Sequence, residues 1–451
     1  MTIAFLTLFF GLITGPYPIE LTVSGPAAAV EILVDGRSAG TLPGAPWKGT
    51  INFGSSLLPH QVVARALDAQ GQELGRAEEW VNLAHPISKA EIVLEGGGSG
   101  PPKAAKVAWT NLKGEKPQSI SLTLDGLPVR LDANGRGALP AHDLGSIHVL
   151  TAQVDFNPLE SVRRDLAYGG EYGSEVSTEL TGVPVRARSG EIPPAGKLGG
   201  WLTAGGKPLS VAAVENGPAK LYVVRVPTAQ EVAEKMGRVG HLARDIRYEM
   251  QLGKEDGIRF VFPVPKRIAG SGDQLSDLFD ISPVSDYRTG SLPWLLRSLR
   301  PPEKPIARRN GRLILADTPV TAPPRIADAV AVAGLQAAAE NRRRAVLLVL
   351  SGDEKEKDAS TYDPARVRRY LAALRVPLVV WTLGKPEPGS LAEAWGPSEN
   401  IEMSQTLYKA AGELRGLLGS QRIVLVDGRL LPQSIALSPQ AAGLELVGAT
   451  P

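Results

Sequence analysis

Residues 343–351 read RRAVLLVLS, an unbroken apolar run that begins after arginines and ends at a polar residue. An Ala-rich stretch precedes it, DAVAVAGLQAAA at residues 328–339, with apolar residues at helical spacing. A second apolar run, VPLVVWTL at residues 376–383, follows a helix that Asp363-Pro364 opens. Apolar strands that alternate with helices predict a doubly wound parallel α/β sheet covered on both faces.

The same alternation continues on both sides of this stretch. KLYVVRV at residues 220–226 predicts a further buried strand, and RIVLV at residues 422–426 is expected to be the last strand of the sheet. We therefore expect the α/β domain to occupy residues 200–451. Three of its strands are expected to be central, adjacent and parallel, namely those that carry Val223, Val346–Val349 and Val379–Val380.

The N-terminal part of the chain contains a repeat with a β pattern. EILVDG at residues 31–36 is echoed by SLTLDG at residues 121–126, and His60 is echoed by His148 at nearly the same offset. Asp-Gly between two extended runs predicts a tight hairpin. We expect two copies of one all-β immunoglobulin-like sandwich, with Asp35 and Asp125 in equivalent turns. Their expected ranges are 18–97 and 103–182, joined by a Gly/Pro linker at 98–102.

Residues 1–15 contain the apolar run IAFLTLFFGLIT at residues 3–14. This length suits the core of a secretory signal and is short for a membrane span. We expect a signal-like segment and an exported protein, periplasmic, cell-surface or extracellular; the alternative is a buried first strand. No later apolar run is long enough to suggest a transmembrane span.

Composition excludes several chemistries. The 451 residues include no cysteine, which removes disulfides, thiolate metal sites and cysteine nucleophiles. The five histidines do not have the spacing of helical metal ligands. Lys and Arg number 49 against 47 for Asp and Glu, a balance that gives no broad basic surface for nucleic acid. We therefore expect no nucleic-acid partner and no cofactor.

Two parts of the chain resemble known families. Residues 30–36 and 60–71 resemble the hairpin and the later strand of bacterial immunoglobulin-like modules. Residues 327–383 resemble a von Willebrand factor type A domain, with IADAV at 326–330 before RRAVLLVLS and VPLVVWTL. The whole chain thus resembles the VWFA-related proteins of the acidobacterial type.

This resemblance implies where a metal-ion-dependent adhesion site would lie and indicates that it has decayed. Members with an intact site hold Mg²⁺ on oxygen ligands from three loops that follow sheet strands. Here the first loop has Arg225 in place of the metal-binding aspartate, and the last reads Ser351-Gly352-Asp353. An arginine offers no lone pair to a cation, so we expect no metal and an Arg225–Asp353 ion pair instead. The degenerate loop positions are Arg225, Thr228, Pro324, Ser351 and Asp353, with Thr318 or Thr321 as substitutes for Pro324 if that loop is shifted.

These observations predict a non-enzymatic, adhesion-type interaction protein whose loops at the strand ends bind a protein or another cell-surface ligand. The alternative is a carboxylate-based hydrolase or a carbohydrate-binding module of the cell envelope that uses Asp353 and Glu354. A structural spacer is a third possibility. We interpret the acids at residues 353–358, among them Asp358, as part of a solvated loop.

Overall fold

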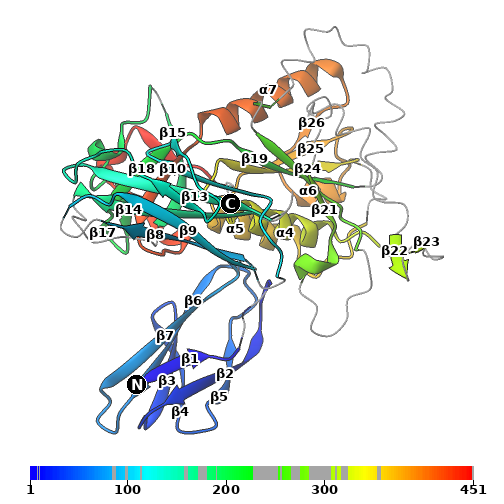
Figure 1. Cartoon of the computed structure of the whole chain (residues 1–451). Coiled ribbons are helices and arrows are strands. Elements are labelled where there is room, and N and C mark those ends of the chain that lie inside the picture. The colour runs from blue at the N-terminus through cyan, green and yellow to red at the C-terminus, as the bar shows by residue number, and fades with distance from the viewer. Residues whose placement is uncertain are drawn as a thin grey trace.

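The computed structural model contains three β-sandwiches and one α/β unit (Figure 1). It describes residues 1–7, 9, 11–83, 88–96, 100–111, 114–156, 161–170, 180–188, 190–226, 252–253, 256–265, 275–283, 306–309, 312–315, 323–352 and 357–448. The statements below concern these residues.

The first sandwich has a three-stranded sheet in the order β1-β2-β5 and a four-stranded sheet in the order β4-β3-β6-β7, both antiparallel. Apolar side chains that alternate along these strands meet in one core between the sheets. The strands are β1 (Thr2–Phe5), β2 (Pro16–Ser24), β3 (Ala29–Val34), β4 (Arg37–Leu42), β5 (Lys48–Asn52), β6 (His60–Leu67) and β7 (Glu73–Val81).

The second sandwich repeats this topology strand for strand. Its sheets have the orders β12-β9-β8 and β11-β10-β13-β14, so that β8 corresponds to β1 and β14 to β7. The strands are β8 (Ser88–Glu95), β9 (Ala104–Asn111), β10 (Ser119–Leu124), β11 (Leu127–Val129), β12 (Arg136–Ala138), β13 (Ile147–Asp155) and β14 (Ser161–Gly169).

The duplication is therefore as expected, but the boundaries differ from 18–97 and 103–182. Strand β8 pairs with β9 from Ser88↔Asn111 to Glu95↔Ala104, so it belongs to the second copy. Of the expected linker at 98–102, residues 100–102 lie between the two strands of this hairpin, within one sandwich, and residues 98 and 99 lie outside the described residues. Gly- and Pro-rich composition marks a turn as readily as it marks a linker between domains.

The two Asp-Gly turns are equivalent, as predicted. Asp35 and Asp125 both have φ of 51°, and a glycine with positive φ follows each, as a type I′ hairpin requires. In each copy the aspartate accepts the Nδ1 hydrogen bond of the repeated histidine at 2.7 Å. The other carboxylate oxygen of the aspartate accepts the backbone N–H of the residue that follows the histidine, which is Gln61 in one copy and Val149 in the other. The aspartate thus ties each hairpin to the neighbouring strand.

Replacing Asp35 by alanine is expected to cost about 1–2 kcal/mol of stability, because a backbone N–H and His60 lose their acceptor. Burial would raise the pKa of Asp35, but its bonds to His60 and Gln61 outweigh burial and lower it. This contribution is therefore present above the ordinary carboxyl pKa and lost as pH falls. Urea unfolding of Asp35→Ala between neutral and acid pH measures it. Asp35→Asn, which keeps an acceptor and tolerates positive φ, is the control and should lose less.

The N-terminal segment forms part of the first sandwich. Thr2–Phe5 pairs antiparallel with β2, and Ile3, Phe9 and Ile13 are buried in the core. This corrects the expectation of a signal-like segment at 1–15: the structure shows the alternative, a buried first strand that corresponds to β8. A short apolar run has the same composition in a signal and in a core strand, so sequence did not separate them.

A third sandwich is built from two distant parts of the chain. One sheet has the order β18-β27-β15-β29 and the other β17-β16-β28, and they enclose a separate core. The α/β unit is inserted between β18 and β27, which differs from the expected range of 200–451. The strands are β15 (Leu180–Ala187), β16 (Leu202–Ala204), β17 (Lys207–Pro208), β18 (Val211–Glu215), β27 (Arg422–Asp427), β28 (Ile435–Leu437) and β29 (Leu444–Leu446).

Strand β27 was expected to be the last strand of the parallel sheet, and it is antiparallel in another sheet. Val424 and Val426 face the core of the third sandwich. Ile423 and Leu425 face outward but are covered by Val149 and Ala167 of the second sandwich. Burial on both faces removes the polar alternation that normally marks an antiparallel strand, so its sequence has the pattern of a parallel one.

The α/β unit has a six-stranded sheet in the order β21-β20-β19-β24-β25-β26, parallel except for β21. Val223, Val346–Val349 and Val379–Val380 lie on adjacent parallel strands, as predicted. Helix α7 covers one face, and α4 and α5 lie across the other (Figure 1). The elements are β19 (Lys220–Arg225), β20 (Gly257–Val261), β21 (Ile281–Pro283), α4 (Ile326–Ala338), β24 (Arg344–Leu350), α5 (Pro364–Ala373), β25 (Leu378–Thr382), α6 (Leu391–Ala394), β26 (Glu399–Asn400) and α7 (Ser404–Ser420), with a separate hairpin of β22 (Ile306–Arg309) and β23 (Arg312–Leu315).

The sandwiches hold the amino edge of the parallel sheet, where its strands begin. Arg342 donates to Gln153 of the second sandwich at 2.5 Å, and Asn341 accepts the N–H of Gly182 in the third at 3.1 Å. Lys220 at the start of β19 pairs with Glu340. The first sandwich instead contacts α5, where Tyr370 donates to the carbonyl of Asn82 at 2.9 Å. The carboxyl edge, where the strands end, is also contacted by the first sandwich, since the Tyr362 hydroxyl donates to the carbonyl of Leu12 at 3.4 Å.

Candidate functional site

The carboxyl edge of the sheet carries two of the predicted site residues. Arg225 ends β19 and Ser351 follows β24, and each is only 3% exposed. Arg225 pairs in register with Val349, so Ser351 lies on the same face of the neighbouring strand. The Arg225 guanidinium lies 5.2 Å from the centre of the Phe260 ring, within cation–π range. A buried cation therefore lies at the carboxyl edge, at the first of the predicted loop positions.

Thr228, Asp353, Thr318 and Thr321 lie outside the described residues, as does Glu354. The predicted Arg225–Asp353 pair therefore stays a prediction. The residues that are described do not fit a Mg²⁺ site, because a guanidinium has donors only and the cation needs oxygen ligands. Within the described ranges, no group of three or more His, Asp or Glu side chains is arranged to hold a metal ion.

The loop before α4 and the segment after β24 are tied together by polar contacts. Asp358 accepts the N–H groups of Ile326 and Ala327 at 2.8 and 3.1 Å, which caps the start of α4. Ser360 accepts the N–H of Asp328 at 3.0 Å. Pro324, a predicted site position, accepts the N–H of Ala359 at 2.8 Å through its carbonyl. These bonds join the two loops directly to each other.

Asp328 completes this contact from the helix side. It is fully buried and accepts the N–H groups of Thr361 and Tyr362 at 2.9 and 3.2 Å. Arg325 donates to it through Nε at 2.7 Å. Burial raises the pKa of Asp328, although its bonds to Thr361 and Arg325 oppose the rise. We refer to Pro324, Arg325, Asp328, Asp358 and Ser360 as the loop lock.

The interpretation of Asp358 as a solvated acid was wrong, because its carboxylate caps α4. The sequence holds a signal of this role, since Asp358-Ala359-Ser360 has the residue types that accept backbone N–H groups in turns and caps. The partner helix begins 32 residues earlier than the residue that caps it, as the bond to Ile326 shows. Capping patterns are read between near neighbours in sequence, so this one was not recognised.

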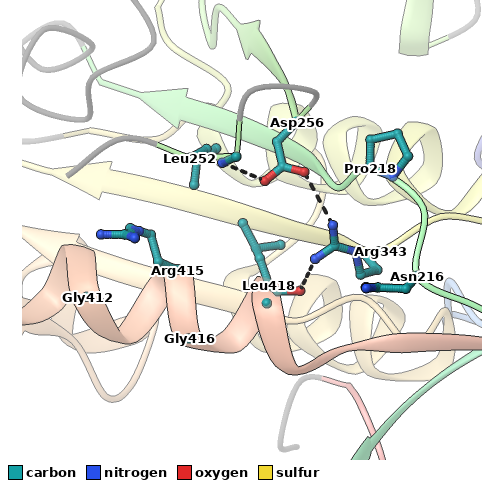
Figure 2. Close-up of a pocket in the computed structure, with 11 residues that line it drawn as sticks. Asn216, Pro218, Leu252, Asp256, Arg343, Gly412, Arg415, Gly416 and Leu418 are labelled. Carbon is teal, nitrogen blue, oxygen red and sulfur yellow. Dashed lines mark hydrogen bonds and ion pairs between the residues drawn. The ribbon is translucent and has the colours of Figure 1, made fainter. Parts of the chain in front are cut away.

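A cavity of about 800 Å³ lies at the amino edge, beside the last turns of α7 (Figure 2). The chain crosses twice between the third sandwich and the α/β unit beside this cavity: Asn216 and Pro218 lie on the first crossing, and Leu418 lies in the last turn of α7, just before the second. Gly412, Gly416 and Gly419 of α7 line another side. No sequence motif pointed to this cavity, since its walls come from segments far apart in the chain.

Arg343 lies in the wall of the cavity and forms three polar contacts. Its Nε donates to the carbonyl of Gly217 at 2.6 Å and its Nη1 to the carbonyl of Leu418 at 2.9 Å, so it joins both crossings (Figure 2). Its Nη2 lies 3.5 Å from Oδ1 of Asp256. Burial, and to a lesser extent the charge of Arg422, lowers the pKa of Arg343, while Asp256 opposes this.

Comparisons with known proteins give weak and partial likenesses. No protein-family model matches the chain, and no curated protein matches it. The fibronectin(III)-like modules of CbhA from Clostridium thermocellum are 13% identical and match 38% of this chain and 94% of theirs, with a TM-score of 0.15. The central fibronectin-III array of RIM-binding protein is 12% identical over 42% of this chain and 74% of its own, with a TM-score of 0.19.

A third likeness is to SGBP-B of the Bacteroides ovatus mixed-linkage glucan utilization locus, in complex with a mixed-linkage heptasaccharide. It is 17% identical over 48% of this chain and 58% of its own, with a TM-score of 0.14. TM-scores this low carry no argument about the fold or the function of this chain. None of the described helices combines the length and apolar character needed to cross a bilayer.

Proposed function

We propose that the chain is an exported, non-enzymatic interaction protein of the adhesion type, in which a von Willebrand A-like domain binds its ligand without a metal ion. The loop lock is the observation that carries this proposal. It holds the loops at the carboxyl edge in place with side chains of the chain itself, while the second and third sandwiches contact the opposite edge. Ligands of open parallel sheets bind at the carboxyl edge.

Magnesium is expected to leave the melting temperature unchanged. A ligand raises the melting temperature only by binding the native state, and Arg225 disfavours a cation at this edge. Differential scanning calorimetry of the full chain in EDTA and in millimolar Mg²⁺ measures this. Calcium in place of magnesium is the control for a non-specific effect of divalent ions. A rise of several degrees with Mg²⁺ alone would refute the metal-independent proposal.

Ligand capture is expected to depend on the carboxyl edge. Lys385 and Glu387 are exposed in the loop after β25, and the N–H of Glu387 lies 3.4 Å from the carbonyl of Gly352. The double charge reversal Lys385→Glu with Glu387→Lys should abolish capture of envelope proteins from the native organism in the presence of EDTA. Lys409→Glu on α7 is the matched control. Equal capture by both variants would place the binding surface elsewhere.

The same preparations test the alternative function and the location. Turnover of a polysaccharide or peptide panel that is lost in Glu354→Gln would replace the non-enzymatic proposal with a hydrolase. Cell fractionation with N-terminal sequencing tests export, and cleavage after residue 15 would remove strand β1 from the mature protein.

A further inference from the structure

Among the residues that the structure describes, the cavity at the amino edge is lined by more positive than negative charge. The ionisable lining residues in these ranges are Arg343, Arg415 and Asp256. Both oxygens of Asp256 already accept backbone N–H groups, from Ala219 at 2.7 Å and from Gly253 at 2.9 Å. The contact from Nη2 of Arg343 to this carboxylate, at 3.5 Å, is at the outer limit of a hydrogen bond. Asp256 therefore compensates Arg343 only in part.

Arg415 adds a second guanidinium at the rim. Its side chain is exposed on α7, and it forms no ion pair with any residue in the described ranges. In Figure 2 Arg415 and Arg343 lie toward opposite ends of the lining, with Leu418 between them. The cavity thus presents a partly buried cation and an exposed cation on either side of an apolar surface, which suits an elongated molecule with negative charge.

Three glycines keep this space open. A Cβ added at Gly412, Gly416 or Gly419 would meet no atom within 4 Å, so the folded chain does not require glycine there. Each glycine in an exposed helix destabilises it by about 1 kcal/mol relative to alanine. The absence of side chains at these positions leaves the helix backbone accessible from the cavity.

We propose that this cavity binds a small organic anion, a carboxylate or a phosphate ester, with its charged group at Arg343 and its body along the glycines of α7 toward Arg415. Charge-assisted hydrogen bonds from a guanidinium to carboxylate or phosphate oxygens are strong and directional. Since Arg343 also holds the carbonyls of Gly217 and Leu418, the bound anion stiffens both crossings to the inserted α/β unit. This site lies at the amino edge of the sheet, opposite the carboxyl edge where we propose that the ligand binds. The two proposals are therefore independent of each other.

Isothermal titration calorimetry and thermal unfolding of the full chain test the proposal at constant ionic strength. The probes are succinate, inorganic phosphate and the neutral analogue succinamide. We expect saturable binding and a rising melting temperature for succinate or phosphate, and none for succinamide. The probe that binds shows whether the charged group of the bound anion is a carboxylate or a phosphate.

Variants on α7 separate this site from non-specific anion effects. Gly416→Leu fills the cavity and improves helix propensity, so it should abolish binding while the melting temperature without ligand stays the same or rises. Arg415→Gln should weaken binding by at least about tenfold. Glu413→Gln, on α7 but outside the lining, is the control. Undiminished binding in Gly416→Leu, or no saturable binding of either anion to the unaltered chain, would overturn the proposal.

Discussion

Replacing Arg163 by methionine is expected to destabilise the protein by about 3–5 kcal/mol at neutral pH, the cost of removing one partner from a buried ion pair. The Arg163 side chain is 10% exposed and lies between two acids. It donates to Asp165 of its own strand at 2.8 Å and to Glu215 of the third sandwich at 2.5 Å. Methionine keeps the apolar bulk of the side chain but leaves two carboxylates without their cation.

The loss in Arg163→Met should shrink as the pH falls. Burial raises the pKa of Glu215 in the intact protein, and Arg163 opposes this rise. Without Arg163 the pKa of Glu215 rises further, so the variant is most stable below the ordinary carboxyl pKa and loses stability as pH increases through the raised value. Urea unfolding from acid to neutral pH measures this trend.

Arg76→Met provides the control for Arg163→Met. Arg76 also makes two bonds to a carboxylate, that of Glu73, but its side chain is 57% exposed. Exposed pairs contribute little to stability, because solvent screens the two charges, so Arg76→Met should lose much less than Arg163→Met. Equal losses in the two variants would contradict the view that the buried pair joins the second and third sandwiches.

Replacing Asp328 by alanine is expected to cost about 3–5 kcal/mol, because Asp328 is the fully buried partner of an ion pair and the partly buried Arg325 loses its counter-ion. The N–H groups of Thr361 and Tyr362 lose their acceptor in the same change. The two loops at the carboxyl edge should then separate, so the variant should also lose ligand capture. Calorimetry measures the stability, and limited proteolysis at residues 357–363 reports the release of the loop.

Asp363→Ala is the matched control for Asp328→Ala. Asp363 caps α5 by accepting the N–H of Arg366 at 2.8 Å, but it is exposed, so its loss should cost about 1 kcal/mol. Restoration of Asp328→Ala by Mg²⁺ would contradict the metal-independent loop lock, since added ions should act on neither variant.

The candidate site was located from sequence more successfully than its chemistry was. Arg225 and Ser351 were placed at one edge because the carboxyl ends of parallel strands meet there. Asp328 and Asp358 were missed because their partners are backbone N–H groups that come close only when the loops fold together. Arg343 was interpreted only as one of the arginines that precede a strand. Nothing near it in the sequence indicated that its side chain bonds to the carbonyls of Gly217 and Leu418.

By itself the sequence determined the duplicated hairpins, in which Asp35 and Asp125 adopt the same turn, and the three parallel strands around Leu347. These features depend on residues close together in the chain, where turn geometry and apolar periodicity act locally. Only the tertiary structure decided that Thr2–Phe5 is a sandwich strand and that β27 returns to a third sandwich after the α/β unit. Both segments are short apolar runs, and their partners are set by long-range packing: the outer face of β27 is apolar because the second sandwich covers it.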